Sequence, residues 1–167
     1  MKITLRPYSL SDVEEFMDWC DEKVIARSRI SHYSTKEEAE TYLKEEAMPH
    51  PWYRAICLDN RPVGFISLTP ESGSFRCRGV ISYAVGSKYW GQGTATRAVE
   101  MAIPIVFEEF PDMERLEGYA DVDNMASLRV LEKTGFKKEG VLKKYFLSKE
   151  NKCMDVVMCS IIKNSHE

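Results

Sequence analysis

Two glycines one residue apart, Gly91 and Gly93, stand between an apolar strand-like run at 78–89 and a helical pattern that begins near Thr94. Glycine inside a regular element costs roughly 0.5–1 kcal/mol relative to alanine, so this pair calls for an explanation. A strand, a glycine turn and a helix start form an anion site, because the first helical N–H groups lack partners and the helix dipole is positive there. A tight structural turn is the alternative. Neither a GxxxxGK[ST] loop nor a GxGxxG fingerprint is present.

The patterns on either side of this turn predict an α/β (α+β) fold with a mixed, mostly antiparallel sheet flanked by helices. Capping boxes are expected at Ser11–Glu14 and at either Ser34–Glu37 or Thr35–Glu38. Gly135 is expected to end the last helix. The predicted strands are 2–8, a hairpin over 52–70, 78–89, 115–122, and a closing hairpin of 140–148 with 155–163; the predicted helices are 11–20, 34–47, about 94–109 and 124–135.

Length and charge narrow the class of protein. A chain of 167 residues predicts one domain over 1–167, and 44% hydrophobic residues are ample for its core. The net charge of −3 provides no basic field, so we expect neither a nucleic-acid nor a membrane partner. The five cysteines are odd in number and show no CxxC spacing, which predicts free thiols, no metal site and a cytoplasmic location.

A second motif follows the glycine turn. Asn124 ends a predicted strand, Ser127 lies one helical turn later, and Gly135-Phe136 stands at the helix terminus. Asn124 and Gly135 are good N-cap and C-cap residues, and that local explanation holds whatever else they do. Together with the stretch from Trp90 to Ala95 and the opening LRPYSLSD, these residues resemble the GNAT superfamily of acetyl-CoA-dependent N-acetyltransferases. The resemblance is to the branch that contains ribosomal-protein N-terminal acetyltransferases.

The resemblance implies a coenzyme A site. In this family the amides of the glycine turn hold the pyrophosphate, and the preceding strand pairs with the pantetheine arm. Carried over, the strand residues are Tyr83, Ala84 and Val85, the phosphate residues are Gly91, Gln92, Gly93, Thr94, Ala95 and Thr96, and the later contacts are Asn124 and Ser127. Trp90 departs from the family pattern, which has Arg or Gln there, so its side chain cannot pair with phosphate.

The resemblance also implies direct attack of an amine on the thioester, without an acyl-enzyme. Many relatives protonate the thiolate with a Tyr seven residues after the Asn, but this chain has Leu131 there, which leaves Ser127 as the candidate acid. The usual base position carries Tyr119. Strand alternation places Glu117 on the same face, so Glu117 acting through water, or bulk solvent, is the alternative base.

The resulting expectation is an N-acetyltransferase that uses acetyl-CoA and a primary amine. A protein N-terminus is the first acceptor to test, on branch analogy alone. A small amine such as a polyamine is the alternative within enzymes. A non-catalytic acyl-CoA-binding module is the alternative outside them, because Leu131 and Tyr119 replace the usual acid and base.

Overall fold

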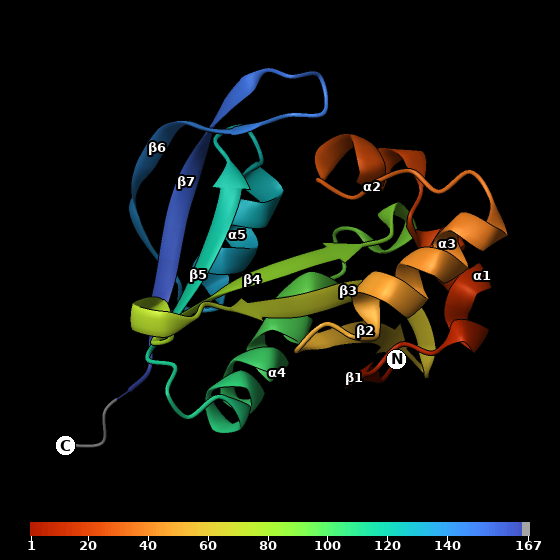
Figure 1. Ribbon diagram of the computed structural model, residues 1–167, viewed down its shortest axis with the longest axis horizontal. Helices are drawn as coiled ribbons and strands as arrows, with labels where there is room; N and C mark the ends of the chain where they lie inside the picture. Colours follow the sequence, from red (N-terminus) through yellow and green to blue (C-terminus); the bar gives the residue numbers. More distant parts are fainter. Residues whose placement is uncertain (165–167) are drawn as a thin grey trace. The chain divides into compact units, whose positions relative to one another are not determined.

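The computed structural model describes residues 1–164, and its elements are labelled in Figure 1. Its helices are α1 (Val13–Trp19), α2 (Glu22–Arg27), α3 (Lys36–Tyr42), α4 (Thr94–Glu109) and α5 (Met125–Lys133). Its strands are β1 (Ile3–Arg6), β2 (Tyr53–Leu58), β3 (Arg61–Pro70), β4 (Arg78–Val85), β5 (Arg115–Asp121), β6 (Lys137–Leu147) and β7 (Cys153–Ile162).

The strands follow the order β1-β2-β3-β4-β5-β7-β6. The pairs β1–β2, β2–β3, β5–β7 and β6–β7 are antiparallel, while β4 and β5 run parallel over Arg78–Val80 and Arg115–Glu117. The predicted α+β fold with a mostly antiparallel sheet is therefore confirmed. The parallel pair follows from the connection through α4, since parallel neighbours need a crossover.

Two local predictions were wrong. Between the first two strands the chain forms three helices instead of two, because α2 was not predicted. The first capping box lies at Ser9 and Asp12, where the Ser9 backbone N–H donates to Asp12 Oδ2 at 3.0 Å, and not at Ser11–Glu14. At the second helix start Thr35 is the N-cap, and its Oγ1 accepts from the Glu38 N–H at 3.2 Å, but the reciprocal bond of a capping box is replaced by one from the Ser34 N–H to Glu38 Oε2 at 2.8 Å.

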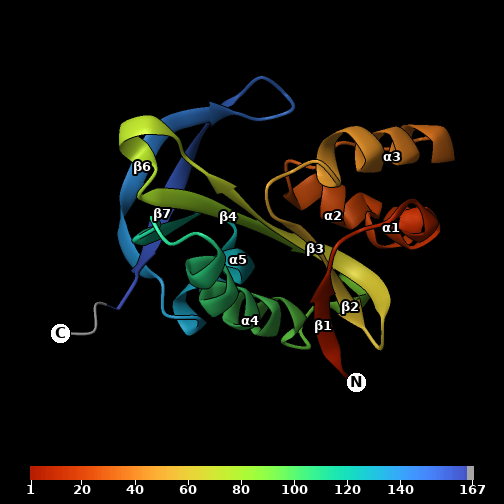
Figure 2. The ribbon, with the colours of Figure 1, turned by 60° about the horizontal axis from the view of Figure 1, so that its bottom comes forward.

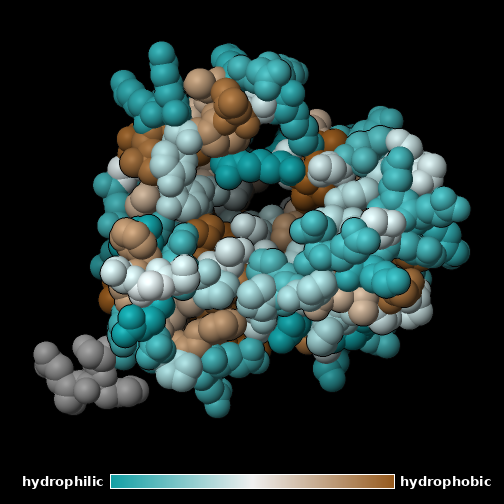
Figure 3. Space-filling view, in the orientation of Figure 1, coloured by the Kyte–Doolittle hydropathy of each residue, from teal (hydrophilic) through white to brown (hydrophobic). Residues whose placement is uncertain are grey.

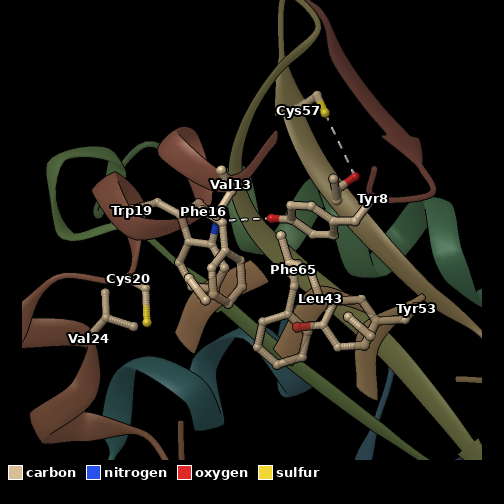
Figure 4. Packing of buried hydrophobic residues seen from close by; sticks show 13 residues of the cluster. Tyr8, Val13, Phe16, Trp19, Cys20, Val24, Leu43, Tyr53, Cys57 and Phe65 are labelled. Carbon is tan, nitrogen blue, oxygen red and sulfur yellow. Dashed lines mark hydrogen bonds between the residues drawn. The ribbon is translucent and has the colours of Figure 1, made fainter. Parts of the chain in front are cut away.

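The chain forms two compact units. The first contains Met1–Thr69 with Tyr83–Ala98. In it α1, α2 and α3 gather on one face of β2 and β3 (Figure 2), where their apolar side chains enclose an aromatic core. Figure 4 shows the Trp19 indole directed at the Tyr8 hydroxyl, to which it donates a hydrogen bond at 2.9 Å. Phe16 packs edge-on against Trp19 with ring centroids 5.1 Å apart.

The second unit contains Pro70–Ser82 and the chain from Val99 to the end of the described residues. Here α5 lies along β5 (Figure 1). Its Leu131 is 1% exposed and fills the space beside Gly118, where a Cβ would lie 2.6 Å from Leu131 Cδ2. Glycine at position 118 therefore leaves room for the Leu131 side chain, which would have to shift if a Cβ were present. Gly135, with φ +95°, follows α5, and its N–H donates to the Glu132 carbonyl at 3.1 Å, as expected of a helix end.

The face seen in Figure 3 is mostly hydrophilic, with hydrophobic side chains in scattered groups. Among the described residues, no helix has the length and apolar character needed to cross a membrane.

Candidate active site

The carboxyl end of β4 lies directly against a glycine of the neighbouring strand β3. A Cβ at Gly64 of β3 would lie 2.2 Å from the Ala84 carbonyl oxygen, so only glycine allows these backbones to approach so closely. The Gly64 carbonyl in turn accepts a hydrogen bond from the buried Tyr8 hydroxyl at 2.6 Å. The predicted pantetheine strand, Tyr83–Val85, thus packs closely on β3 within the first unit.

The next segment is fastened to α1 and α2. A Cβ at Gly86 would lie 2.9 Å from Trp19 Cβ, and the Gly86 N–H donates to the Val63 carbonyl at 2.8 Å. Asp21 uses both carboxylate oxygens: Oδ1 caps α2, and Oδ2 accepts from the Ser87 hydroxyl at 2.7 Å and the Ser87 N–H at 3.0 Å. Burial raises the pKa of Asp21, but these hydrogen bonds outweigh it and lower the pKa overall.

Gly91 and Gly93 have the geometry that an anion-binding turn needs. Their φ angles are +73° and +77°, which non-glycine residues rarely adopt, and a Cβ at either position would meet nothing within 4 Å. Packing therefore does not explain these glycines, whereas backbone conformation and open access do. The Arg97 N–H donates to the Gly93 carbonyl at 2.9 Å, which closes the first turn of α4. Amides that precede this bond have no carbonyl within the helix, so the turn fits a phosphate group.

Trp90 has a role that the sequence did not indicate. Its indole N–H donates to the Val85 carbonyl at 2.7 Å, which ties the glycine turn to the end of β4. The Arg27 guanidinium lies over the indole ring, 5.0 Å from its centroid. The sequence singled out Trp90 but predicted neither of its contacts, and it gave no indication of Arg27. Their contact depends on tertiary structure, and the only available signal was an aromatic residue where the family has Arg or Gln.

In the second unit, Glu117 and Tyr119 form a hydrogen-bonded pair on β5. The Tyr119 hydroxyl donates to Glu117 Oε2, as their placement on one strand face predicted. Glu117 is 2% exposed, and its Oε1 lies 3.2 Å from Arg115 Nε and 3.6 Å from an Arg78 amino nitrogen. Burial and the hydrogen bond to Glu117 raise the pKa of Tyr119, so the phenol stays neutral at physiological pH.

Asn124 and Ser127 meet at the start of α5. Asn124 Oδ1 accepts a hydrogen bond from the Ser127 N–H at 3.2 Å, so the N-cap role predicted for Asn124 is confirmed. Leu131, at the position of the usual family tyrosine, is a core residue. Within the second unit, Ser127 and Tyr119 are the hydroxyl groups that the resemblance puts forward as acid and base. The glycine turn belongs to the first unit and these side chains to the second.

A glycine turn of this geometry, after a strand and before a helix in an α+β fold, is typical of proteins that bind a phosphate-bearing ligand. Residues 2–137 match the family of acetyltransferase (GNAT) domains. The chain belongs to the GNAT family of acetyltransferases, and its activity is N-acetyl transfer from acetyl-CoA.

Individual relatives agree with this assignment. An uncharacterized N-acetyltransferase, p20, of Bacillus licheniformis is 25% identical over 175 residues, which span 99% of this chain and 95% of that protein. RimJ of Mycobacterium smegmatis, solved with CoA-disulfide, superposes with a TM-score of 0.81 at 22% identity, over 96% of this chain and 81% of its own. The Salmonella typhimurium acetyltransferase that modifies the N-terminal serine of ribosomal protein L7/L12 gives a TM-score of 0.81 at 20% identity, over 98% of this chain and 96% of its own.

Proposed function

We propose that this chain transfers the acetyl group of acetyl-CoA to the α-amino group of a protein N-terminus. The observation that carries the cofactor site is the pair of open, positive-φ glycines before α4. The acceptor proposal is supported by the branch resemblance and by likeness over nearly the whole chain to an enzyme described as acting on an N-terminal serine.

In the first unit, the proposed roles follow from the backbone. Tyr83–Val85 hold the pantetheine arm, and the N–H groups of Gly91–Thr96 hold the pyrophosphate, where the start of α4 contributes positive potential. Acetyl-CoA supplies the thioester. A backbone N–H at Val85 polarises its carbonyl, which stabilises the charge that develops on that oxygen during attack.

In the second unit, the proposed roles belong to two hydroxyl groups. As Tyr119 Oη takes a proton from the attacking amine, the phenol's own proton passes along its hydrogen bond to the Glu117 carboxylate, so Tyr119 stays neutral. Glu117, held by Arg78 and Arg115, orients the phenol and receives that proton. Ser127 gives a proton to the departing thiolate.

A panel of acceptors tests this function. Acetyl-CoA is incubated with lysine-free peptides that carry free N-terminal Ser or Ala, with the same peptides blocked at the N-terminus, and with polyamines. Thiol release and peptide mass are followed. We expect release with free peptides and none with blocked ones. Release with polyamines alone would favour the small-amine alternative, and coenzyme A binding without release from any acceptor would favour a non-catalytic module.

A further inference from the structure

A positively charged side chain stands beside the cofactor turn and has no assigned role. Arg27 ends α2, and its guanidinium lies 5.0 Å from the centre of the Trp90 ring. Trp90 directly precedes Gly91 and occupies the place where the family pattern has Arg or Gln. The chain therefore has a cation next to the turn, but it comes from another element.

Arg27 is held there by contacts at both ends of its helix. At the start of α2, Asp21 binds the hydroxyl and the N–H of Ser87, which lies in the same segment as the turn. At the other end, the guanidinium rests on Trp90, whose own N–H is fixed to the Val85 carbonyl. The segment before the turn is also joined to α1, because Lys88 Nζ lies 2.9 Å from Asp18 Oδ2. A side chain fixed in this way loses little conformational freedom when it binds a ligand.

The positive charge of Arg27 is also available to a ligand. Within residues 1–164 the guanidinium of Arg27 stacks on the Trp90 ring, and no carboxylate forms an ion pair with it. Trp90 is 38% exposed, so the ring and the guanidinium on it lie at the surface. A guanidinium is planar, stacks on aromatic faces and presents N–H groups that match two phosphate oxygens at once.

We propose that Arg27 binds a phosphate group of coenzyme A and supplies the charge that Trp90 cannot. The Trp90 ring is the platform on which the guanidinium stacks, and the hydrogen bond from the indole N–H to the Val85 carbonyl holds this platform at the turn. This inference rests on the placement of coenzyme A at Gly91–Thr96 in the proposed function.

The test is coenzyme A binding, measured by titration calorimetry at several salt concentrations. Arg27→Gln is expected to weaken Kd about tenfold, the equivalent of about 1.4 kcal/mol. Its Kd should also depend less on salt, because one screened charge contact is lost. The matched control is Lys23→Gln, an exposed cation at the other end of the same helix, which should change Kd less than about twofold.

A second pair of variants tests the platform. Trp90→Phe keeps an aromatic face for Arg27, whereas Trp90→Leu removes it, so the leucine variant should lose more affinity. In the double variant, adding Trp90→Leu to Arg27→Gln should lower the affinity for coenzyme A by less than Trp90→Leu does alone. The reason is that both substitutions remove the same interaction. Full additivity of the two changes would overturn the platform role.

The outcomes separate this proposal from the cofactor site itself. Wild-type affinity in Arg27→Gln, with weakened binding in Gly93→Val, overturns the role of Arg27 alone. Unchanged affinity in both variants overturns the cofactor placement as well. Equal losses in Arg27→Gln and Lys23→Gln, or a loss with unchanged salt dependence, would show that no phosphate contact exists.

Discussion

The Tyr119 hydroxyl donates a hydrogen bond to Oε2 of Glu117, two residues earlier on the same strand, and Glu117 is in turn held by Arg78 and Arg115. By the family resemblance the phenol occupies the position of the usual base, and a buried carboxylate fixes its orientation. This arrangement favours a neutral tyrosine that relays a proton over an ionised one.

Tyr119→Phe removes the relay and keeps the ring, which stacks on Tyr145 with centroids 5.5 Å apart. We expect kcat to fall by about 10²-fold, the size of a lost acid–base group. Because the pKa of Tyr119 is raised above its ordinary value of about 10, the wild-type pH–rate profile should show no limb from this phenol below about pH 10. Tyr145→Phe is the control, because it leaves the Tyr119 hydroxyl and its hydrogen bond to Glu117 in place. A Tyr119→Phe enzyme with normal kcat would assign the base to solvent.

Gly93→Val should weaken coenzyme A binding tenfold or more, or about 1.4 kcal/mol. Valine is strained at a φ of +77°, and its side chain would occupy the open side of the turn. Gly140→Val is the matched control, because Gly140 also has open space but no positive φ. The affinity for coenzyme A is measured by calorimetry on folded proteins. Equal affinities in the two variants would show that the turn at Gly93 does not bind the phosphate groups.

The sequence predicted those parts of the site that depend on local pattern. Alternation along 115–121 placed Glu117 and Tyr119 on one face, and the residue types at 124–127 predicted the Asn124 cap; both are confirmed. Helix α2 was missed because it has only six residues and its cap, Asp21, binds Ser87 across 66 positions. No local pattern encodes such a contact, and the same holds for Arg27 on Trp90. The roles of the predicted site residues remain predictions.

No single Cys→Ser or Cys→Ala change should abolish turnover, because direct transfer needs no thiol nucleophile. All five cysteines are free; Cys20, Cys57 and Cys159 are buried, and burial raises the pKa of the Cys57 and Cys159 thiols. A thiol reagent should therefore react rapidly with exposed Cys77 and Cys153 in the folded protein. Mass spectrometry that trapped an acetyl group on any cysteine at a competent rate would contradict direct transfer.

Leu131→Tyr should destabilise the protein without supplying the usual family acid. Leu131 is 1% exposed and packs on Gly118, so the larger ring cannot be accommodated without shifting α5 from β5. Overpacking of this kind costs about 1–3 kcal/mol, measurable by urea unfolding. Leu131→Met, which nearly conserves volume, is the control and should cost less. Higher activity in Ser127→Ala with Leu131→Tyr than in Ser127→Ala alone would show that the site does accept a tyrosine acid.

Ser127→Ala separates catalysis from binding. If Ser127 protonates the thiolate, kcat should fall by about 10²-fold while the affinity for acetyl-CoA changes little. A thiol pKa of about 8.5 makes the thiolate a fair leaving group, which limits the loss.

Asn124 is the companion position, and two variants separate its roles. Asn124→Ala loses the helix cap, which alone costs about 1 kcal/mol of stability, and with it the proposed cofactor contact. Asn124→Asp keeps an oxygen for the Ser127 N–H, so it tests the cofactor contact with the cap in place. We expect both to weaken acetyl-CoA binding more than they lower kcat. A Ser127→Ala enzyme with near-normal kcat, measured where chemistry limits the rate, would reduce Ser127 to a cofactor contact and make water the acid.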